Sequence, residues 1–377
     1  MANNNDKKVL NVPALRFPEF TGEWEKCKLS KVCSFFSGGT PPSSNKEYYN
    51  GNIPFIRSGE LHNDETELFI TKEGLDNSAA KMVEVGDLLL ALYGATSGDI
   101  AISKIKGAIN QAILCIRTKQ NKKFVESVWN KHVARLLQTY LQGGQGNLSA
   151  DIVKNIPFYF TNIEEQNKLA RFISLLDQRI AAQNKIIEDL KKLKSAIYQE
   201  LFSNLQGEEK SLSELAEITK GQQVNGNQLS ENGKYYVMNG GIMPSGYYDD
   251  YNTEAGTISI SEGGNSCGYV QYNKSKFWSG GHCYTLHIKP TARISTLFLF
   301  HCLKWKEEDI MALRIGSGLP NIQKKDLSKV RIIVPTFDKQ QQLIALLSTL
   351  QMKIEYEEMY TINLDKQKLH LLSQMFI

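Results

Sequence analysis

The chain has 377 residues, of which 41% are hydrophobic and 22% are charged, and its formal net charge is +4. This is the composition of a folded protein with about two to three domains, and it excludes a disordered or a fibrous chain. The longest apolar runs, such as 88–92 and 297–300, are too short to span a bilayer, and the polar first residues contain no secretory signal. We therefore expect a cytoplasmic protein without membrane contact, whose mildly basic charge permits a nucleic acid partner.

Six segments follow one another along the chain. Their boundaries lie where β-rich stretches with glycine turns give way to long amphipathic stretches. The segments are an N-terminal segment (1–22), a first globular region (23–162), a long helix (163–203), a linker (204–210), a second globular region (211–336) and a second long helix (337–377). Expected strands are 88–92, 112–116, 257–260 and 284–288, and expected moderate helices lie near 123–141 and 294–305. This order of elements indicates an α+β fold.

The two long helices carry the same apolar seam. Steps of four and three residues follow one face of each helix, and the second seam repeats the first at an offset of 174, as Leu343 against Leu169. The polar interruptions Gln183 and Glu357 coincide as well. A two-stranded coiled coil explains this better than two separate core helices, and a two-fold axis perpendicular to the helices makes them antiparallel. The apolar seam residues, which we also expect to support partner docking, are Leu169, Ile173, Leu176, Ile180, Leu190, Ile197, Leu201, Leu343, Leu347, Leu350, Ile354, Leu364, Leu371 and Met375.

The globular regions repeat together with the helices. The pattern Leu-Ser-x-apolar occurs at 29–32 and again at 212–215, and segment 143–151 is similar to segment 316–326. Repeats of this length indicate one structural unit used twice. The predicted fold is a tandem pseudo-two-fold repeat of two α+β globular regions, each followed by a long helix, with the helices pairing as an antiparallel coiled coil.

Motifs for catalysis are absent from the sequence. It contains no G-x-x-x-x-G-K-[ST], no G-x-G-x-x-G that opens a helix after a strand, and no H-E-x-x-H. The Pro41-Pro42 pair lacks the preceding amide and the following aromatic residue that an amino-methyltransferase uses on a flipped base. The triplet 208–210 is similar to the end of a nuclease motif, but its place in a polar linker favours a solvated charge run. The cysteines form no C-x-x-C pair, so we expect buried thiols and no metal site.

Two copies of one fold joined by paired helices have the layout of a symmetric DNA-binding dimer, which holds two reading heads over two half-sites. Local marks agree with this layout, in particular the segment 13–24, the turn 36–41, the segment 86–90 and the pair Asn110-Gln111. In their order and repetition, these marks make the chain resemble the specificity subunits of type I restriction–modification systems. The resemblance extends over essentially the whole sequence.

The resemblance implies a division of labour among subunits. Such specificity subunits carry two target-recognition domains and two conserved helical regions, and they have no catalytic activity of their own. They recruit two adenine methyltransferase subunits, which use S-adenosylmethionine, and restriction subunits that depend on ATP and Mg. The implied target is double-stranded DNA with an asymmetric, bipartite sequence, and no cofactor is expected on this chain.

Candidate DNA-binding residues are polar side chains in or beside glycine-bearing turns. Base edges are read by side chains that offer paired donors and acceptors, although such residues often satisfy local backbone groups instead. The candidates are Arg57, Tyr93, Thr96, Gln111, Gln145 and Asn147 in the first region, and Asn239, Asn265, Tyr269, Lys274, Arg314 and Asn321 in the second. His282 and His301 lack clustered partners, and we interpret both as packed side chains.

Two other classes of function stay open at this point. One is an enzyme, a DNA methyltransferase or nuclease with unrecognised motifs, against which the missing acid, base and cofactor constellations argue. The other is a structural coiled-coil adaptor without DNA readout, against which the glycine-rich loops of both globular regions argue.

Overall fold

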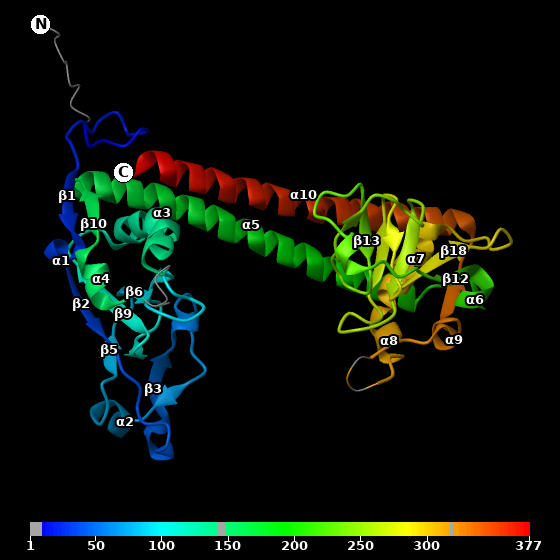
Figure 1. Cartoon of the computed structure of the whole chain (residues 1–377), viewed down its shortest axis with the longest axis horizontal. Coiled ribbons are helices and arrows are strands. Elements are labelled where there is room, and N and C mark those ends of the chain that lie inside the picture. Colours follow the sequence, from blue (N-terminus) through cyan, green and yellow to red (C-terminus); the bar gives the residue numbers. More distant parts are fainter. Residues whose placement is uncertain (1–9, 142–147, 317, 319) are drawn as a thin grey trace, which may run out of the picture. The chain divides into compact units, whose positions relative to one another are not determined.

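A computed structural model describes residues 10–141, 148–316, 318 and 320–377. The chain divides into two compact units (Figure 1). Unit 1 comprises residues 1–184 and 360–377, and unit 2 comprises residues 185–359. The boundary between the units falls within both long helices, α5 (Ile163–Ser203) and α10 (Phe337–Met375). Each unit therefore contains the first part of one long helix and the last part of the other.

The described part of unit 1 contains two four-stranded sheets and one two-stranded sheet. Its strands are β1 (Glu25–Lys28), β2 (Cys33–Ser37), β3 (Tyr49–Ile56), β4 (Phe69–Ile70), β5 (Lys81–Val83), β6 (Leu88–Ala91), β7 (Ile100–Ile102), β8 (Gly107–Ile109), β9 (Ile113–Thr118) and β10 (Pro157–Phe160). Its shorter helices are α1 (Leu29–Val32), η1 (Lys46–Tyr48), η2 (Ser58–Glu60), α2 (Lys72–Asp76), α3 (Lys122–Leu141) and α4 (Ala150–Asn155). The strand orders are β2-β9-β6-β7, β4-β3-β8-β5 and β1-β10.

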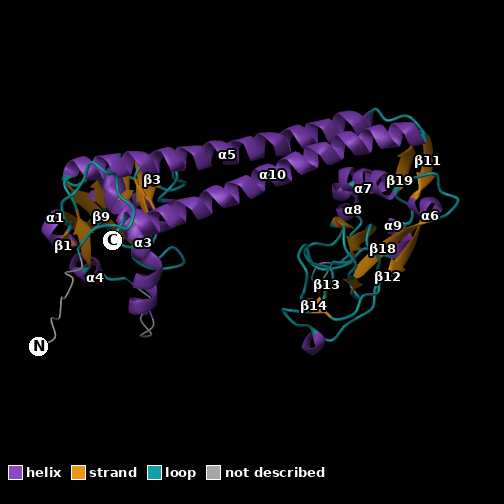
Figure 2. Ribbon diagram, turned by 90° about the horizontal axis from the view of Figure 1, so that it is seen from above, coloured by secondary structure: helices purple, strands orange, loops and turns teal. Residues whose placement is uncertain are grey.

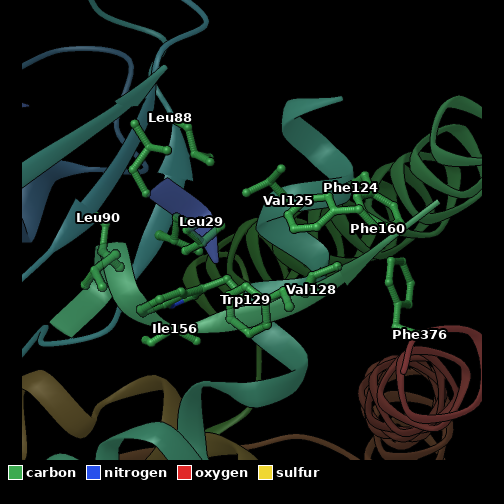
Figure 3. Packing of buried hydrophobic residues seen from close by; sticks show 14 of the residues in the cluster. Leu29, Leu88, Leu90, Phe124, Val125, Val128, Trp129, Ile156, Phe160 and Phe376 are labelled. Carbon is green, nitrogen blue, oxygen red and sulfur yellow. The ribbon is translucent and has the colours of Figure 1, made fainter. Parts of the chain in front are cut away.

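Strand β6 is buried on both faces, which accounts for its continuous apolar sequence. Successive side chains of a strand point to opposite faces of the sheet. Leu88 and Leu90 pack in one core with Phe124 and Trp129 of α3, whereas Leu89 packs in a second core on the other face. Figure 3 shows the first of these cores. A strand covered on both faces needs apolar residues at every position, as the sequence has them.

Unit 2 repeats this construction in its described residues. Its strands are β11 (Glu208–Ser211), β12 (Ala216–Lys220), β13 (Tyr235–Met238), β14 (Tyr247–Tyr248), β15 (Thr257–Ser261), β16 (Val270–Asn273), β17 (Trp278–Ser279), β18 (Cys283–Ile288) and β19 (Arg331–Val334). Its shorter helices are α6 (Leu212–Leu215), η3 (Gly226–Gln228), α7 (Thr296–Trp305), α8 (Glu307–Ala312) and α9 (Lys324–Leu327). The strand order β12-β18-β15-β16 reproduces β2-β9-β6-β7, and the pairs β13/β17 and β11/β19 reproduce β3/β8 and β1/β10. The predicted α+β tandem repeat is confirmed.

The long helices run antiparallel within each unit. In unit 1, Leu169 of α5 shares a core with Met375 of α10, and Asp177 forms an ion pair with Lys368 at 2.6 Å. In unit 2, the last turns of α5 and the first turns of α10 lie together beside β11 and β19 (Figure 2). There Lys194 Nζ donates a hydrogen bond of 2.7 Å to Gln351 Oε1. Every apolar seam residue predicted from the sequence is buried or half-buried.

A phenylalanine at the C-terminal end of each long helix completes the core of a globular region. Phe376, which directly follows α10, packs against Trp24 and Phe124 in unit 1, with ring centroids 6.3 and 5.5 Å away. Phe202 of α5 packs against Phe298 and Trp305 in unit 2, at 6.2 and 5.5 Å. Phe202 and Phe376 are separated by the same 174 residues as the two seams, and both rings fill equivalent places in their units.

A buried glutamine anchors the first turn of each long helix. Gln166 accepts a hydrogen bond from the backbone N–H of Asn121 at 3.1 Å and donates to the Thr161 carbonyl at 2.7 Å. Gln340 accepts from the backbone N–H of Ser295 at 2.9 Å and donates to the Pro335 carbonyl at 3.1 Å. These bonds satisfy buried and partly buried backbone groups, which are costly to leave without a partner. The sequence reasoning missed both residues, although they share the 174-residue offset of the seam.

Two expectations need correction. The segment 204–210 is not wholly a linker, because Glu208, Glu209 and Lys210 belong to β11 and pair with Val334, Ile333 and Ile332 of β19. Two cysteines, Cys27 and Cys33, are half-buried, whereas the other four are buried as expected, and all six are free thiols. None of the helices in the described residues combines the length and apolar character needed to cross a membrane.

Candidate nucleic-acid interface

Two short segments meet at one end of the sheet in unit 1. The hairpin turn, residues 92–99, joins β6 to β7, and the sheet-to-sheet loop, residues 110–112, joins β8 to β9. Leu92 N–H donates to the Ala112 carbonyl at 2.8 Å, which ties the two segments together. Leu148 N–H donates to the Leu92 carbonyl at 2.8 Å, so the segment that leads into α4 reaches the same place.

Unit 2 ties the same segments together with the same bonds. Its hairpin turn is 262–269 and its sheet-to-sheet loop is 280–282. Glu262 N–H donates to the His282 carbonyl at 2.9 Å, and Ile322 N–H donates to the Glu262 carbonyl at 2.8 Å. The Cys267 thiol donates a hydrogen bond to the Glu262 carbonyl at 3.0 Å, and the Ser97 hydroxyl donates one to the Leu92 carbonyl at 3.0 Å. These bonds fix which positions of the two units correspond: Glu262 to Leu92, and His282 to Ala112.

In unit 1, the structure brings three candidates to these segments. Tyr93 and Thr96 lie in the hairpin turn, and Gln111 lies in the sheet-to-sheet loop. Burial raises the pKa of Tyr93, while a side-chain hydrogen bond with Gln111 acts in the opposite direction. The exposed Gln111 also shares a hydrogen bond with Thr40. Gln145 and Asn147 lie outside the described residues.

Arg57 directly follows β3, beside the sheet-to-sheet loop, and its guanidinium is paired with two carboxylates. It forms ion pairs of 2.8 Å with both Glu60 and Glu67, which raise the pKa of Arg57. Glu60 is buried, and it also accepts hydrogen bonds from the Thr66 hydroxyl and from backbone N–H groups. Burial alone would raise the pKa of Glu60, but these bonds outweigh it and lower the pKa from 4.5 to about 2. The Arg57 side chain therefore braces the end of β3 in the unbound protein.

The Glu60 carboxylate should make unit 1 sensitive to acid. Because its pKa is lower in the folded than in the unfolded chain, its stabilisation is present above about pH 4.5 and is lost as the pH falls toward about 2. We expect Glu60→Gln to flatten the fall in the thermal midpoint of unit 1 over this range, whereas Glu67→Gln, at an exposed carboxylate, has a smaller effect. An equally steep fall for Glu60→Gln and wild type would contradict this assignment.

In unit 2, three of the asparagine candidates gather at the matching place. Asn239 Oδ1 accepts a hydrogen bond from the His282 backbone N–H at 3.1 Å. Asn239 and Asn321 line a cavity of about 470 Å³, together with Glu262 and His282, and Asn265 follows in the hairpin turn. Gly240 and Gly264, with φ of 85° and 80°, provide left-handed turns at this cavity that a side chain would strain.

The candidate Arg314 is exposed and lies next to this place in the chain. It precedes Ile315, which exchanges backbone hydrogen bonds with Asn321.

The side chains of the remaining two candidates, one at the end of the hairpin turn and one after β16, line a different cavity of unit 2. The Tyr269 ring is covered by Lys304 Nζ at 4.2 Å, and Lys274 lies 3.6 Å from Glu355 of α10. Both line a separate cavity of about 780 Å³ next to α7 and α10. The structure therefore does not bring Tyr269 or Lys274 together with Asn239.

One histidine was interpreted wrongly. His301 is packed as expected, since its Nδ1 lies 2.6 Å from the Tyr198 hydroxyl and burial lowers its pKa to about 4. His282, in contrast, has a side chain that is 62% exposed. Sequence reasoning also missed its neighbour Glu262. The sequence carries little indication of either residue. Both are polar where unit 1 has Leu92 and Ala112, and this correspondence becomes visible only from the backbone hydrogen bonds.

Among the described residues, histidine, cysteine and acidic side chains form no cluster of three or more that could hold a metal ion. Both units present polar loops on a repeated sheet framework.

Comparison with known proteins decides the family. The family described as "Type I restriction modification DNA specificity domain" matches twice, over residues 21–192 and 205–364, and these ranges include both hairpin turns. The chain belongs to this family. Among curated relatives, a putative type I specificity subunit of Mycoplasma pneumoniae is 34% identical over 157 residues, which are 41% of this chain and 42% of that protein. The putative type I restriction enzyme MjaX specificity subunit of Methanocaldococcus jannaschii is 21% identical over 96% of this chain and 94% of its own length.

A solved structure shares the fold of this family member. The type I restriction–modification S subunit of M. genitalium superposes with a TM-score of 0.63 and 20% identity, covering 97% of this chain and 99% of that one. Its identity is low, so it supports the fold alone. The chain spans less than half the length of the Mycoplasma pneumoniae relative, and the activity of the whole protein is therefore a matter for proposal.

Proposed function

We propose that this chain is the sequence-specific DNA-recognition subunit of a type I restriction–modification complex, and that its two units read the two halves of an asymmetric, bipartite target. One observation carries the proposal. A single framework of sheets, turns and hydrogen bonds occurs twice, while equivalent loop positions hold different side chains, such as Arg57 against Asn239 and Tyr93 against Gly263. Similar frameworks with different loops suit two readers of different half-sites.

The loops offer the chemistry that base readout requires. Arginine, asparagine and glutamine can present paired hydrogen-bonding groups to base edges in the major groove. Gln111, Asn265 and Asn321 are exposed at the sheet ends that carry the hairpin turns. A coiled-coil adaptor without DNA contact would have no use for two such loop sets on matching frameworks.

The long helices serve as the docking platform in this proposal. The seam residues hold the two helices together and are covered, so a partner would contact other side chains. Large apolar residues are exposed on α10, including Met352, Tyr356 and Met359 in unit 2 and Leu369 in unit 1, with 59 to 66% of their surface accessible. Exposed apolar stripes of this kind mark surfaces for protein partners. The proposed partners are two methyltransferase subunits, together with restriction subunits, in the cytoplasm.

Catalysis is assigned to the partners. S-adenosylmethionine would be bound by the methyltransferase subunits, and ATP and Mg by the restriction subunits. The chain itself would position these subunits on DNA. We expect the purified chain to transfer no methyl group and to cleave no DNA, and we expect methylation when it is combined with its methyltransferase subunits.

This expectation is tested with radiolabelled S-adenosylmethionine and host genomic DNA from a strain that lacks the complex. Three samples are compared: the chain alone, the methyltransferase subunits alone, and the two together. Labelled DNA only in the combined sample supports the proposal. Transfer by the chain alone, or equal transfer with and without the chain, would contradict it.

A further inference from the structure

Each unit has a polar residue at the start of its hairpin turn and a polar residue in its sheet-to-sheet loop. In unit 2 these polar residues lie one position away from their equivalents in unit 1. In unit 1, the polar side chains are Tyr93 in the hairpin turn and Gln111 in the sheet-to-sheet loop. The residue before Tyr93 is the apolar Leu92, and the residue after Gln111 is the apolar Ala112. Unit 2 has Gly263 and Gly281 at the positions of that polar pair. Its polar side chains are instead Glu262 and His282, at the positions of Leu92 and Ala112. Each unit thus has one polar pair that bridges its hairpin turn and its sheet-to-sheet loop, and the two pairs differ in chemistry and in place.

In unit 2, hydrogen bonds from the protein hold Glu262 of this pair, while His282 is exposed to solvent. Glu262 is 9% exposed, and its Oε1 accepts from Lys220 Nζ at 2.7 Å and from the Tyr284 hydroxyl at 3.0 Å. Its Oε2 is buried and has no hydrogen-bond partner among the described residues. The exposed His282 ring lies directly beyond it, with Nδ1 at 3.8 Å from Oε2. A buried carboxylate oxygen without a partner is costly, so this arrangement needs an explanation.

The turn itself can be built without this pair. Unit 1 forms the same turn, the same backbone bonds and the same order of its four-stranded sheet with Leu92 and Ala112. The Tyr284 hydroxyl has a second acceptor, the Ile322 carbonyl at 3.2 Å, and Lys220 is half in solvent. An acidic and a basic side chain at positions where apolar residues suffice therefore point to a ligand.

We propose that Glu262 and His282 are the specificity-determining pair of unit 2: Glu262 orients the His282 ring, and the outer His282 nitrogen accepts a hydrogen bond from the exocyclic amino group of a cytosine or an adenine in the major groove. This inference rests on the proposed function. A carboxylate is only an acceptor. A small rotation of the exposed His282 ring closes the gap to Oε2, and once Nδ1–H donates to Glu262, the outer Nε2 becomes an acceptor as well. His282 Nε2 is then the exposed acceptor of the pair, and the complementary donors in the major groove are cytosine N4 and adenine N6.

The test uses the chain in complex with its methyltransferase subunits and duplexes that contain its mapped target. Each cytosine or adenine of the half-site read by unit 2 is replaced, one at a time, by 2-pyrimidinone or purine, which lack the amino group. At one position we expect wild type to lose about tenfold in affinity. Glu262→Leu with His282→Ala, the residues of unit 1 at these positions, should bind the natural and the modified duplex equally well. His282→Ala alone, at an exposed position, should reduce the discrimination at the same position.

The matched control is Tyr93→Gly with Gln111→Gly, which gives unit 1 the residues of unit 2. It should alter discrimination only in the other half-site. Unchanged discrimination by both Glu262/His282 variants at every position would overturn the inference, as would a wild type that is insensitive to all amino-group removals but sensitive to replacement of purine N7 by carbon. Failure of the wild-type complex to bind any DNA sequence preferentially would instead overturn the proposed function.

Discussion

Phe376→Ala is expected to lower the stability of unit 1 by about 3 to 5 kcal/mol and to leave unit 2 nearly unchanged. The Phe376 ring is 2% exposed and fills the space between Trp24 and Phe124. Its removal leaves a cavity where the last turn of α10 meets α3, and surrounding side chains that belong to other elements can close that cavity only in part. Because domain stabilities are of order 5 to 15 kcal/mol, this loss is a large fraction of the total.

Phe202→Ala is the reciprocal variant and should destabilise unit 2 by a similar amount. The four tryptophans permit separate readouts, since Trp24 and Trp129 lie in unit 1 and Trp278 and Trp305 lie in unit 2. Urea unfolding is followed by fluorescence in backgrounds where the two tryptophans of the other unit are phenylalanine. Leu369→Ala, at a side chain that is 66% exposed on α10, is the control with little expected effect. Equal loss in both units from either phenylalanine variant would contradict the assignment of each ring to one core.

Exchange of residues 25–160 for the corresponding region of another family member should change one half of the DNA target and preserve the other. The exchange is structurally conservative, because β1 pairs with β10 and the two junctions, Glu25 and Phe160, are direct partners across this ladder. The framework of unit 2, with Asn239, Glu262 and His282, stays as it is. Target sites of the parent and the exchanged chain are compared by mapping methylated adenines. A change in both halves, or in neither, would contradict separate reading by the two units.

The helices and the main strands were predictable because their signals are local and repeated. The seam from Leu169 to Leu201 recurs at one offset, so its partner from Leu343 to Met375 was identified residue by residue. Strand β6 was predicted from an apolar run that is covered on both faces. The antiparallel sense followed from the symmetry of the repeat, and contacts within each unit confirm it.

The candidate site was predictable only in part, because its correspondences depend on loops of unequal length. The offset is 182 between Arg57 and Asn239, 170 between Leu92 and Glu262, and 174 between the helices. Without the backbone bonds, no single alignment reveals that Glu262 and His282 occupy the positions of Leu92 and Ala112. Tyr269 and Lys274 were chosen for the same glycine-rich context, but their side chains contact Lys304 and Glu355 instead.

Mapping methylated adenines in genomic DNA tests the central claim most directly. The chain is expressed with its methyltransferase subunits in a host that lacks adenine methylation, and the modified sites are located by single-molecule sequencing. We predict one asymmetric motif, made of two different specific sequences separated by a spacer of fixed length and free sequence. A continuous or symmetric motif, or methylation without sequence preference, would contradict a chain whose two units read two different half-sites.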